Sequence, residues 1–381
     1  MIFLDSPSTT PLDPRVLDAM LPHLHGRDLR LLGQAERSAK GAVVRVARED
    51  IAGLLGCLPN ELIFTSGATE ANNLAILGFA ARLEKPGRIV SQATEHSAVL
   101  EPLRHLQMRG WDVSLLPVDE CGRVSLETLQ QSLSTPTDLV SIMWGNNEIG
   151  TIQPVEKIAE LCNERGIAFH CDAAQSVGKI PIDLSDIPIS MLTLSAHKFY
   201  GPVGVGALFV RDLAKQKIVS PLTFGGGQER GIRPGTLNVP AIVGLGAASR
   251  LANERMGEWA NHMKMLCLQF ESQLQENVAD ISINGDVDNR LPHISNIAFH
   301  GVDNEGLLTM LPEIIASTGS ACHYADFNPS HVLTALNKLP PVGECSLRFG
   351  FTKDSSETET DTAAQMIALA VQEFRASTVG N

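Results

Sequence analysis

The stretch Ile167-Ala-Phe-His-Cys-Asp172-Ala-Ala-Gln175 decides the fold, because an apolar run ends there on a carboxylate that is soon followed by an amide. Short apolar runs that are bounded by polar or glycine residues are typical of strands. The segment before it, Val155 to Arg165, is helix-like and is ended by Gly166. A helix that leads directly into such a strand indicates a parallel sheet covered by helices.

The same alternation continues on both sides of this stretch. Thr69 to Leu83 is another helix-like segment between two runs of strand character. We therefore expect an α/β fold with a mostly parallel sheet that is covered on both faces. The seven expected strands are Leu62 to Thr65, Arg88 to Ser91, Asp112 to Leu116, Leu139 to Met143, Ile167 to Cys171, Met191 to Leu194 and Gly206 to Val210.

A change of pattern near Ala241 predicts a second, smaller α+β domain. A long helical region runs from there to about Asn277, and short strands follow at 297–299, 313–316 and 346–351 before an amphipathic closing helix at 360–375. We expect an N-terminal arm at residues 1–15 that packs with the small domain, a large domain at 16–250 and a small domain at 251–381.

Composition excludes several classes of protein. With 381 residues, 44% apolar and 19% charged, the chain has the ordinary globular mix and can bury a large core. Acidic residues exceed basic ones, 43 to 30, which disfavours direct binding to nucleic acid or to an anionic membrane. The seven cysteines include no Cys-x-x-Cys pair, so we expect neither a disulfide framework nor a metal site. Without a membrane span or a signal peptide pattern, a cytoplasmic location is expected.

The loops after the strands carry the candidate chemistry, because a parallel sheet binds ligands at the carboxyl ends of its strands. Gly67 and Thr69 stand where a helix begins, so they could hold a phosphate, although a hydroxyl helix cap is the commoner explanation. Asp172 follows one strand and Lys198 follows the next. A lysine for an imine, an acid and an anion site are the parts that pyridoxal 5'-phosphate (PLP) requires.

Seven motifs follow one another along nearly the whole chain. They are Thr65-Ser-Gly-Ala-Thr-Glu-Ala-Asn72, Thr94-Glu-His96-Ser, Asn146-Asn147-Glu-Ile-Gly150, Asp172-Ala-Ala-Gln175, Ser195-Ala-His197-Lys198, Gly225 to Thr236 and Gly319-Ser-Ala-Cys322. In this order they resemble the PLP-dependent cysteine desulfurases. The resemblance implies the aspartate aminotransferase-like fold, PLP fold type I, and a homodimer. It also implies conversion of L-cysteine to L-alanine, with the sulfur left as an enzyme persulfide for an acceptor protein.

The resemblance assigns three catalytic residues. Lys198 is similar to the Schiff-base lysine, which also moves the substrate Cα proton. His96 is similar to the histidine that stacks on the cofactor ring and takes part in proton transfer. Cys322 matches the cysteine that receives the sulfur, and the small polar residues around it favour a reactive thiol over the buried apolar role that most free cysteines have.

The remaining assignments concern binding. Asp172 matches the acid at the pyridinium nitrogen, and Gln175 matches the donor to the ring hydroxyl oxygen. Arg348 matches the group that binds the substrate carboxylate, and Asn147 matches a residue that contacts cofactor and substrate. The positions that match phosphate contacts are Ala68, Thr69, Ser195, His197 and, across the dimer interface, Thr236.

Two segments depart from the family pattern. Leu4-Asp5-Ser6-Pro7-Ser8-Thr9-Thr10 replaces a Leu-Asp-Asn-Asn-Ala-Thr-Thr type of start, and Gly26 to Gly33 replaces an Asn-Pro-Ser-Ser-containing loop. Both loops line the substrate entrance in the family, so a different access route or sulfur acceptor is a hypothesis.

The destination of the sulfur and the reaction itself leave alternatives open. Iron-sulfur assembly, tRNA thiolation and DNA phosphorothioation are all open to the family. The residues after Cys322 and the altered loops raise the phosphorothioation branch as a hypothesis. Another PLP-dependent lyase, such as a selenocysteine lyase, and a non-catalytic scaffold that binds a sulfur carrier are the rival readings.

Overall fold

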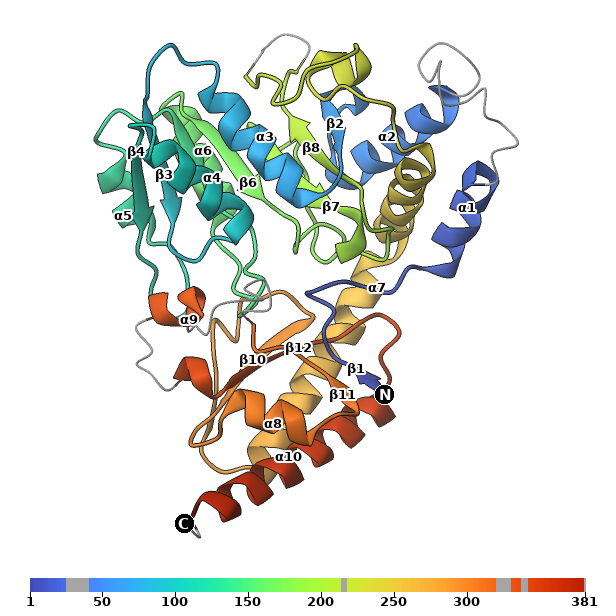
Figure 1. The fold of residues 1–381 in the computed structure, drawn as a ribbon, viewed down its shortest axis with the longest axis vertical. Helices are drawn as coiled ribbons and strands as arrows, with labels where there is room; N and C mark the ends of the chain where they lie inside the picture. Colours follow the sequence, from blue (N-terminus) through green and yellow to red (C-terminus); the bar gives the residue numbers. More distant parts are fainter. Residues whose placement is uncertain (25–40, 214–217, 320–329, 337–341, 380–381) are drawn as a thin grey trace.

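The computed structural model describes residues 1–24, 41–213, 218–319, 330–336 and 342–379 (Figure 1). Among these residues, seven strands form one sheet in the order β2-β8-β7-β6-β5-β3-β4. Only β8 runs against its neighbours β7 and β2, so the sheet is mostly parallel, as expected. The strands are β2 (Leu62–Thr65), β3 (Arg88–Gln92), β4 (Asp112–Leu116), β5 (Leu139–Ser141), β6 (Ala168–Asp172), β7 (Met191–Ser195) and β8 (Gly206–Val210).

Alternate residues of the strands face two separate cores. Ile89 and Leu208 belong to the core beneath helices α3 and α4, whereas their neighbours Val90 and Phe209 belong to the core on the opposite face. This alternation follows from the two-residue period of a strand. The helices of the sheet-bearing part are α1 (Pro14–Leu24), α2 (Gly41–Leu55), α3 (Ala68–Ala80), α4 (Ser97–Gln107), α5 (Leu126–Ser132) and α6 (Val155–Glu164).

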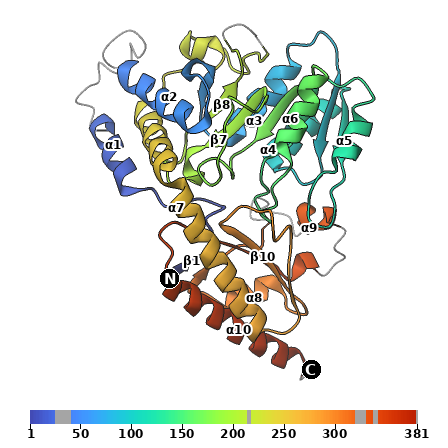
Figure 2. The same cartoon turned by 180° about the vertical axis from the view of Figure 1, so that it is seen from behind.

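Helix α7 (Val239–Asn277) joins the two parts of the molecule and runs along most of its height (Figures 1 and 2). Its first half packs against α1 and α2, and its second half packs against the closing helix α10 (Glu357–Val379). The expected division between residues 250 and 251 falls inside this continuous helix and stays a prediction.

The C-terminal part is built around an antiparallel sheet in the order β12-β10-β9. The N-terminal strand β1 pairs in parallel with β11, so the N-terminal segment packs with this part. Phe270, Phe299, Phe349 and Phe351 pack edge to face between α7 and the sheet. Its further elements are β1 (Ile2–Phe3), β9 (Ile281–Ile283), β10 (Ile294–Phe299), β11 (Ile314–Ile315), β12 (Ser346–Gly350), α8 (Asn304–Met310) and α9 (His331–Ala335).

Element boundaries differ slightly from the sequence-based expectation. Helix α7 begins at Val239, two residues before the expected Ala241, because Asn238 caps it by accepting a hydrogen bond from the Ala241 N–H. Helix α3 ends at Ala80 and not at Leu83. Among the described helices, none is both long enough and apolar enough to cross a membrane.

Candidate functional site

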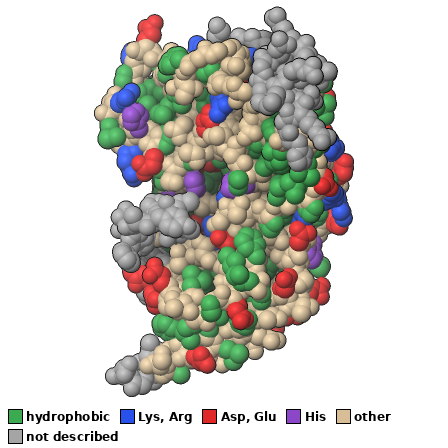
Figure 3. Space-filling model, turned by 45° about the vertical axis from the view of Figure 1, so that its right-hand side comes forward, with side chains coloured by type: hydrophobic (Ala, Val, Ile, Leu, Met, Phe, Trp, Pro, Cys, Tyr) green, Lys and Arg blue, Asp and Glu red, His purple; other side chains and the backbone are tan. Residues whose placement is uncertain are grey.

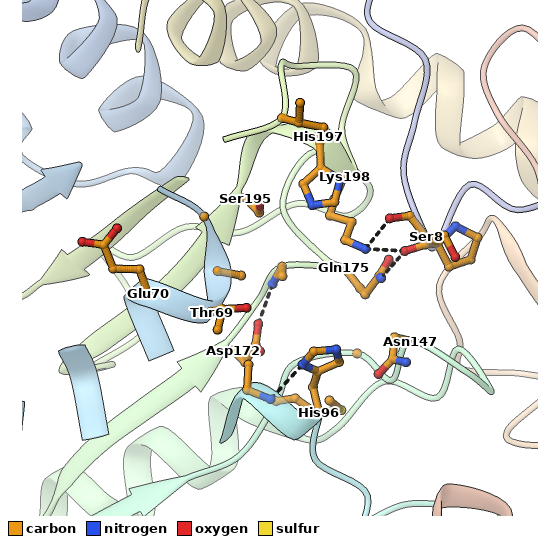
Figure 4. Close-up of a pocket in the computed structure, with 18 of the residues that line it drawn as sticks. Ser8, Thr69, Glu70, His96, Asn147, Asp172, Gln175, Ser195, His197 and Lys198 are labelled. Carbon is orange, nitrogen blue, oxygen red and sulfur yellow. Dashed lines mark hydrogen bonds between the residues drawn. The ribbon is translucent and has the colours of Figure 1, made fainter. Parts of the chain in front are cut away.

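A cavity of about 650 Å³ opens where the carboxyl ends of β6 and β7 meet the C-terminal part of the molecule. Figure 3 shows histidine side chains near the boundary between the sheet-bearing part and the C-terminal part of the molecule. Ten of the twelve residues that the sequence nominated line this one cavity, and Figure 4 shows most of them pointing toward one another. They are Ala68, Thr69, His96, Asn147, Asp172, Gln175, Ser195, His197, Lys198 and Arg348.

Lys198 reaches into the cavity from the short 3-10 helix Ala196–Lys198, which follows β7 directly. Its Nζ donates hydrogen bonds to the carbonyl oxygens of Pro7, at 2.5 Å, and Ser8, at 2.9 Å (Figure 4). The neighbouring His197 is within 3.1 Å of the Thr9 hydroxyl through Nδ1. Burial and the charge of Lys198 lower the pKa of His197 to about 4, so this imidazole is neutral at pH 7.

Asp172 ends β6 with its carboxylate held in a fixed orientation. Its Oδ2 accepts a hydrogen bond from Asn72 Nδ2 at 2.6 Å, and its Oδ1 accepts one from the Ala174 N–H at 2.9 Å. The Gln175 side chain lies toward the N-terminal segment and donates a hydrogen bond from Nε2 to the Pro7 carbonyl at 2.8 Å. A held carboxylate in the same cavity as a lysine amine is suited to face the nitrogen of a pyridine ring.

The N-terminus of α3 forms another wall of the cavity. Its N-cap, Gly67, has a φ of 151° and provides no side-chain hydrogen bond to the first turn. A Cβ on Gly206 would lie only 2.9 Å from Gly67 Cα, so a glycine is needed at 206 for this loop to approach β8. Ser195 lies beside Gly67, and the first-turn amides with the Thr69 hydroxyl suit a phosphate group.

His96 stands at the start of α4, where its ring also caps the helix. Its Nδ1 accepts a hydrogen bond from the Ala98 N–H at 3.0 Å, which fixes the orientation of the ring (Figure 4). The preceding Glu95 is fully buried, and burial raises its pKa well above the ordinary range. Its Oε1 accepts a hydrogen bond from the Met143 N–H at 2.6 Å, which ties the loop before His96 to the loop after β5.

Arg348 projects from β12 and brings the C-terminal part into the site. Its Nη1 donates to the Asn147 carbonyl at 3.0 Å, and its Nη2 donates to Asp5 Oδ1 at 2.7 Å and Ser8 Oγ at 2.8 Å. The Nε of this buried guanidinium has no hydrogen-bond partner within the described part of the chain. A guanidinium that lines the cavity suits the carboxylate of a small ligand.

The structure does not place the other two nominated residues in this cavity. Thr236 is exposed and does not line the cavity of its own chain, so its predicted reach across a dimer interface stays a prediction. Cys322 falls in 320–329, outside the described residues. Gly319, the last residue described before that segment, lines the cavity.

Sequence reasoning missed the part that the N-terminal segment plays. Asp5, Pro7 and Ser8 line the cavity and contact Lys198, Gln175 or Arg348. The departure from the family pattern at Ser6 to Ser8 was the available signal, but it did not identify which partners this segment contacts. Glu70 was also quoted within a motif without a role, although it lines the same cavity.

Taken together, the donor set fits PLP. A lysine amine, a held carboxylate, an imidazole and a helix N-terminus without a side-chain cap surround one cavity, and these groups suit the cofactor's aldehyde, ring and phosphate. Among the described residues there is no cluster of three potential metal ligands.

Comparison with known proteins supports the fold and the sequence resemblance. The sequence profile of the family described as Aminotransferase class-V matches residues 2–362. "Cysteine desulfurase, mitosomal" of Encephalitozoon cuniculi is 43% identical over 98% of this chain and 87% of its own length. A solved structure described as a NifS-like protein superposes with a TM-score of 0.89 at 34% identity, covering 97% of this chain and 99% of the other. The structure described as "SspA in complex with cysteine" superposes with a TM-score of 0.80 at 35% identity, covering 93% of this chain and 100% of the other.

Proposed function

Since the chain belongs to the class-V aminotransferase family and, within it, to the cysteine desulfurases, we propose that it converts L-cysteine to L-alanine and keeps the sulfur as a persulfide. The observation that carries this proposal is the convergence of the Lys198 amine, the Asp172 carboxylate and the Arg348 guanidinium on one cavity. The first two are the groups that PLP needs, and the third is suited to the carboxylate of an amino acid.

PLP, when bound, supplies an electron sink that acidifies the substrate Cα–H and activates the Cβ–S bond. Lys198 would hold the cofactor through Nζ, and Asp172 would lie at its ring nitrogen. The first turn of α3, with Ser195 and Thr69, would hold its phosphate. His96 would stack on the ring in the orientation that the Ala98 N–H imposes on it.

The residues of the chain then bind the substrate and move its protons. Arg348, which lines the cavity, binds the carboxylate and orients the Cα–H toward Lys198. The Lys198 amine takes the Cα proton and returns a proton to carbon. His197 beside it is neutral at pH 7 and adds no second positive charge next to Lys198.

Cys322 completes the reaction as the sulfur acceptor, on the strength of the Gly319-Ser-Ala-Cys322 motif. Its thiolate forms a bond to the substrate sulfur while the Cβ–S bond breaks, and the electron pair of that bond stays with carbon. Protonation of the carbon gives alanine. One cysteine and one enzyme thiol become one alanine and one enzyme persulfide, so the step needs no external oxidant.

The test is an absorbance spectrum of the purified protein before and after L-cysteine, with alanine and sulfide quantified. We expect a yellow protein that makes alanine, and a Cys322→Ala variant that keeps its colour but loses turnover. A variant that kept its turnover would favour another PLP-dependent lyase. A colourless, inactive wild-type protein would favour a non-catalytic scaffold.

The proposal includes a homodimer, in which Thr236 contacts the cofactor phosphate of the neighbouring subunit, and a sulfur acceptor protein. It also keeps the expected cytoplasmic location and places any nucleic-acid contact on the acceptor, because the chain is acidic. A transfer assay that starts from the labelled Cys322 persulfide and offers acceptors of iron-sulfur assembly, tRNA thiolation and DNA phosphorothioation separates the three destinations. Absence of transfer to the last acceptor would remove the phosphorothioation hypothesis.

A further inference from the structure

A carboxylate stands at the end of the cavity where the cofactor phosphate would be held. Glu70 lies in the first turn of α3, next to Thr69, and lines the cavity (Figure 4). Its Oε2 accepts a hydrogen bond from the Ser66 N–H at 2.6 Å, so it closes the turn that leads into the helix. A negative charge at this place would repel the phosphate dianion unless another group compensates it.

Arg233 supplies the compensation from a position 163 residues further along the chain. Its Nε donates to Glu70 Oε1 at 2.8 Å, and its Nη2 donates to Glu70 Oε2 at 3.3 Å. Burial by itself raises the pKa of Glu70, but the hydrogen bonds from Arg233 and Ser66 outweigh it and lower that pKa. The side chains of Arg233 and Glu70 are only 28% and 29% exposed, so solvent screens this pair less than a surface pair.

A second contact braces the segment that carries Arg233. Glu229 is buried, accepts a hydrogen bond from the Phe64 N–H at 2.8 Å and forms an ion pair with Arg48. Glu229 and Arg230 have φ angles of 45° and 60°, a left-handed backbone that non-glycine residues adopt at a cost. The segment is therefore tied both to β2, which leads into the phosphate turn, and to Glu70 within that turn.

We propose that Arg233 is a positioning residue for the cofactor phosphate: it neutralises Glu70 and fixes the Ser66 to Glu70 turn, so that the N-terminus of α3 can hold a dianion. The inference rests on the proposed function, because PLP is the phosphate ester concerned. It concerns affinity for the phosphate group and not the chemistry at Lys198.

The experiment is a titration of cofactor-free protein with PLP and, separately, with pyridoxal, which lacks the phosphate. Arg233→Gln should weaken PLP binding by about tenfold or more, because Glu70 is left as an uncompensated charge. The same variant should bind pyridoxal within about threefold of wild type. The double variant Glu70→Gln/Arg233→Gln should recover most of the lost PLP affinity, since neither charge remains.

Arg255→Gln is the matched control, because it removes a guanidinium from the exposed Arg255–Glu258 pair on α7 and has the same effect on net charge. It should leave both affinities unchanged. The inference would be overturned if Arg233→Gln bound PLP as tightly as wild type. It would also be overturned if the double variant bound PLP as weakly as Arg233→Gln, or if Arg233→Gln lost as much affinity for pyridoxal as for PLP. Failure of the wild-type protein to bind PLP would instead overturn the proposed function.

Discussion

At the scale of single residues, Asp172 shows how the environment orients a candidate cofactor-binding group. Asn72 and the Ala174 N–H orient its two carboxylate oxygens inside a buried site. Asp172→Asn keeps the size of the side chain but cannot hold a positive charge at a pyridine nitrogen. We expect turnover of L-cysteine to fall roughly 100-fold or more, measured as kcat with saturating PLP. Asp354→Asn, an exposed acid outside the cavity, is the control, and an active Asp172→Asn protein would contradict this role.

His170 gives a prediction for the pH dependence of stability. Burial lowers its pKa from 6.5 to about 4, against an opposing effect of the Asp172 charge. Between these two pH values the unfolded chain binds a proton that the folded protein excludes, so this residue makes stability fall as pH drops from 6.5 toward 4. Above pH 6.5, His170 does not make the free energy of unfolding depend on pH. Urea unfolding at several pH values should show the decline, and His170→Gln should make it shallower; an unchanged slope in the variant would exclude this assignment.

At the scale of elements, Ser330 joins α9 to the loop after β5. Its Oγ accepts a hydrogen bond from the Leu333 N–H at 3.2 Å and donates one to Glu148 Oε2 at 2.6 Å. Ser330→Ala removes the helix cap and leaves a buried carboxylate oxygen without this donor. We expect a loss of about 1–3 kcal/mol in the free energy of unfolding. Ser330→Thr should retain most of the stability, and an Ala variant as stable as wild type would show that the contact contributes nothing.

The elements themselves were largely predictable from the sequence. The seven strands lie where apolar runs between polar or glycine boundaries indicated them, because a parallel sheet buried on both faces requires near-continuous apolar strands. Asp172 and Lys198 could be placed in one site for the same reason, since both follow strands of that sheet. The boundary near Ala241 was missed by two residues because the Asn238 cap is a local contact that apolar patterning does not report.

At the scale of the whole molecule, the site depends on contacts that local patterns do not reveal. Asp5 contacts Arg348 across 343 residues of sequence, and Pro7 reaches Lys198 across 191. Both contacts exist because β1 pairs with β11 and carries the following segment over the cavity. Pairing between such distant segments is set by tertiary packing. The sequence therefore showed that Ser6 to Ser8 depart from the family pattern, but not which residues they contact.

This N-terminal segment is packed closely against β12. A Cβ on Gly350 would lie 2.1 Å from Pro7 Cδ and 2.8 Å from Ser6 Oγ, so Gly350→Ala must displace the segment that lines the cavity. We expect the variant to lose about 1–3 kcal/mol of stability and to raise the KM for L-cysteine, because Arg348 loses the orientation that Asp5 and Ser8 provide. Gly257→Ala is the control, since nothing lies within 4 Å of its added methyl group. An unchanged KM would show that the N-terminal segment does not influence substrate binding.

The central claim, that Lys198 holds PLP in this cavity, has a direct test in borohydride reduction of the yellow protein followed by peptide mass spectrometry. The account predicts a single phosphopyridoxyl group, on the peptide that contains Lys198. Lys179 is the informative rival, because it is fully buried nearby and burial lowers its pKa to about 7. A label on Lys179, or no label on any lysine, would contradict the account.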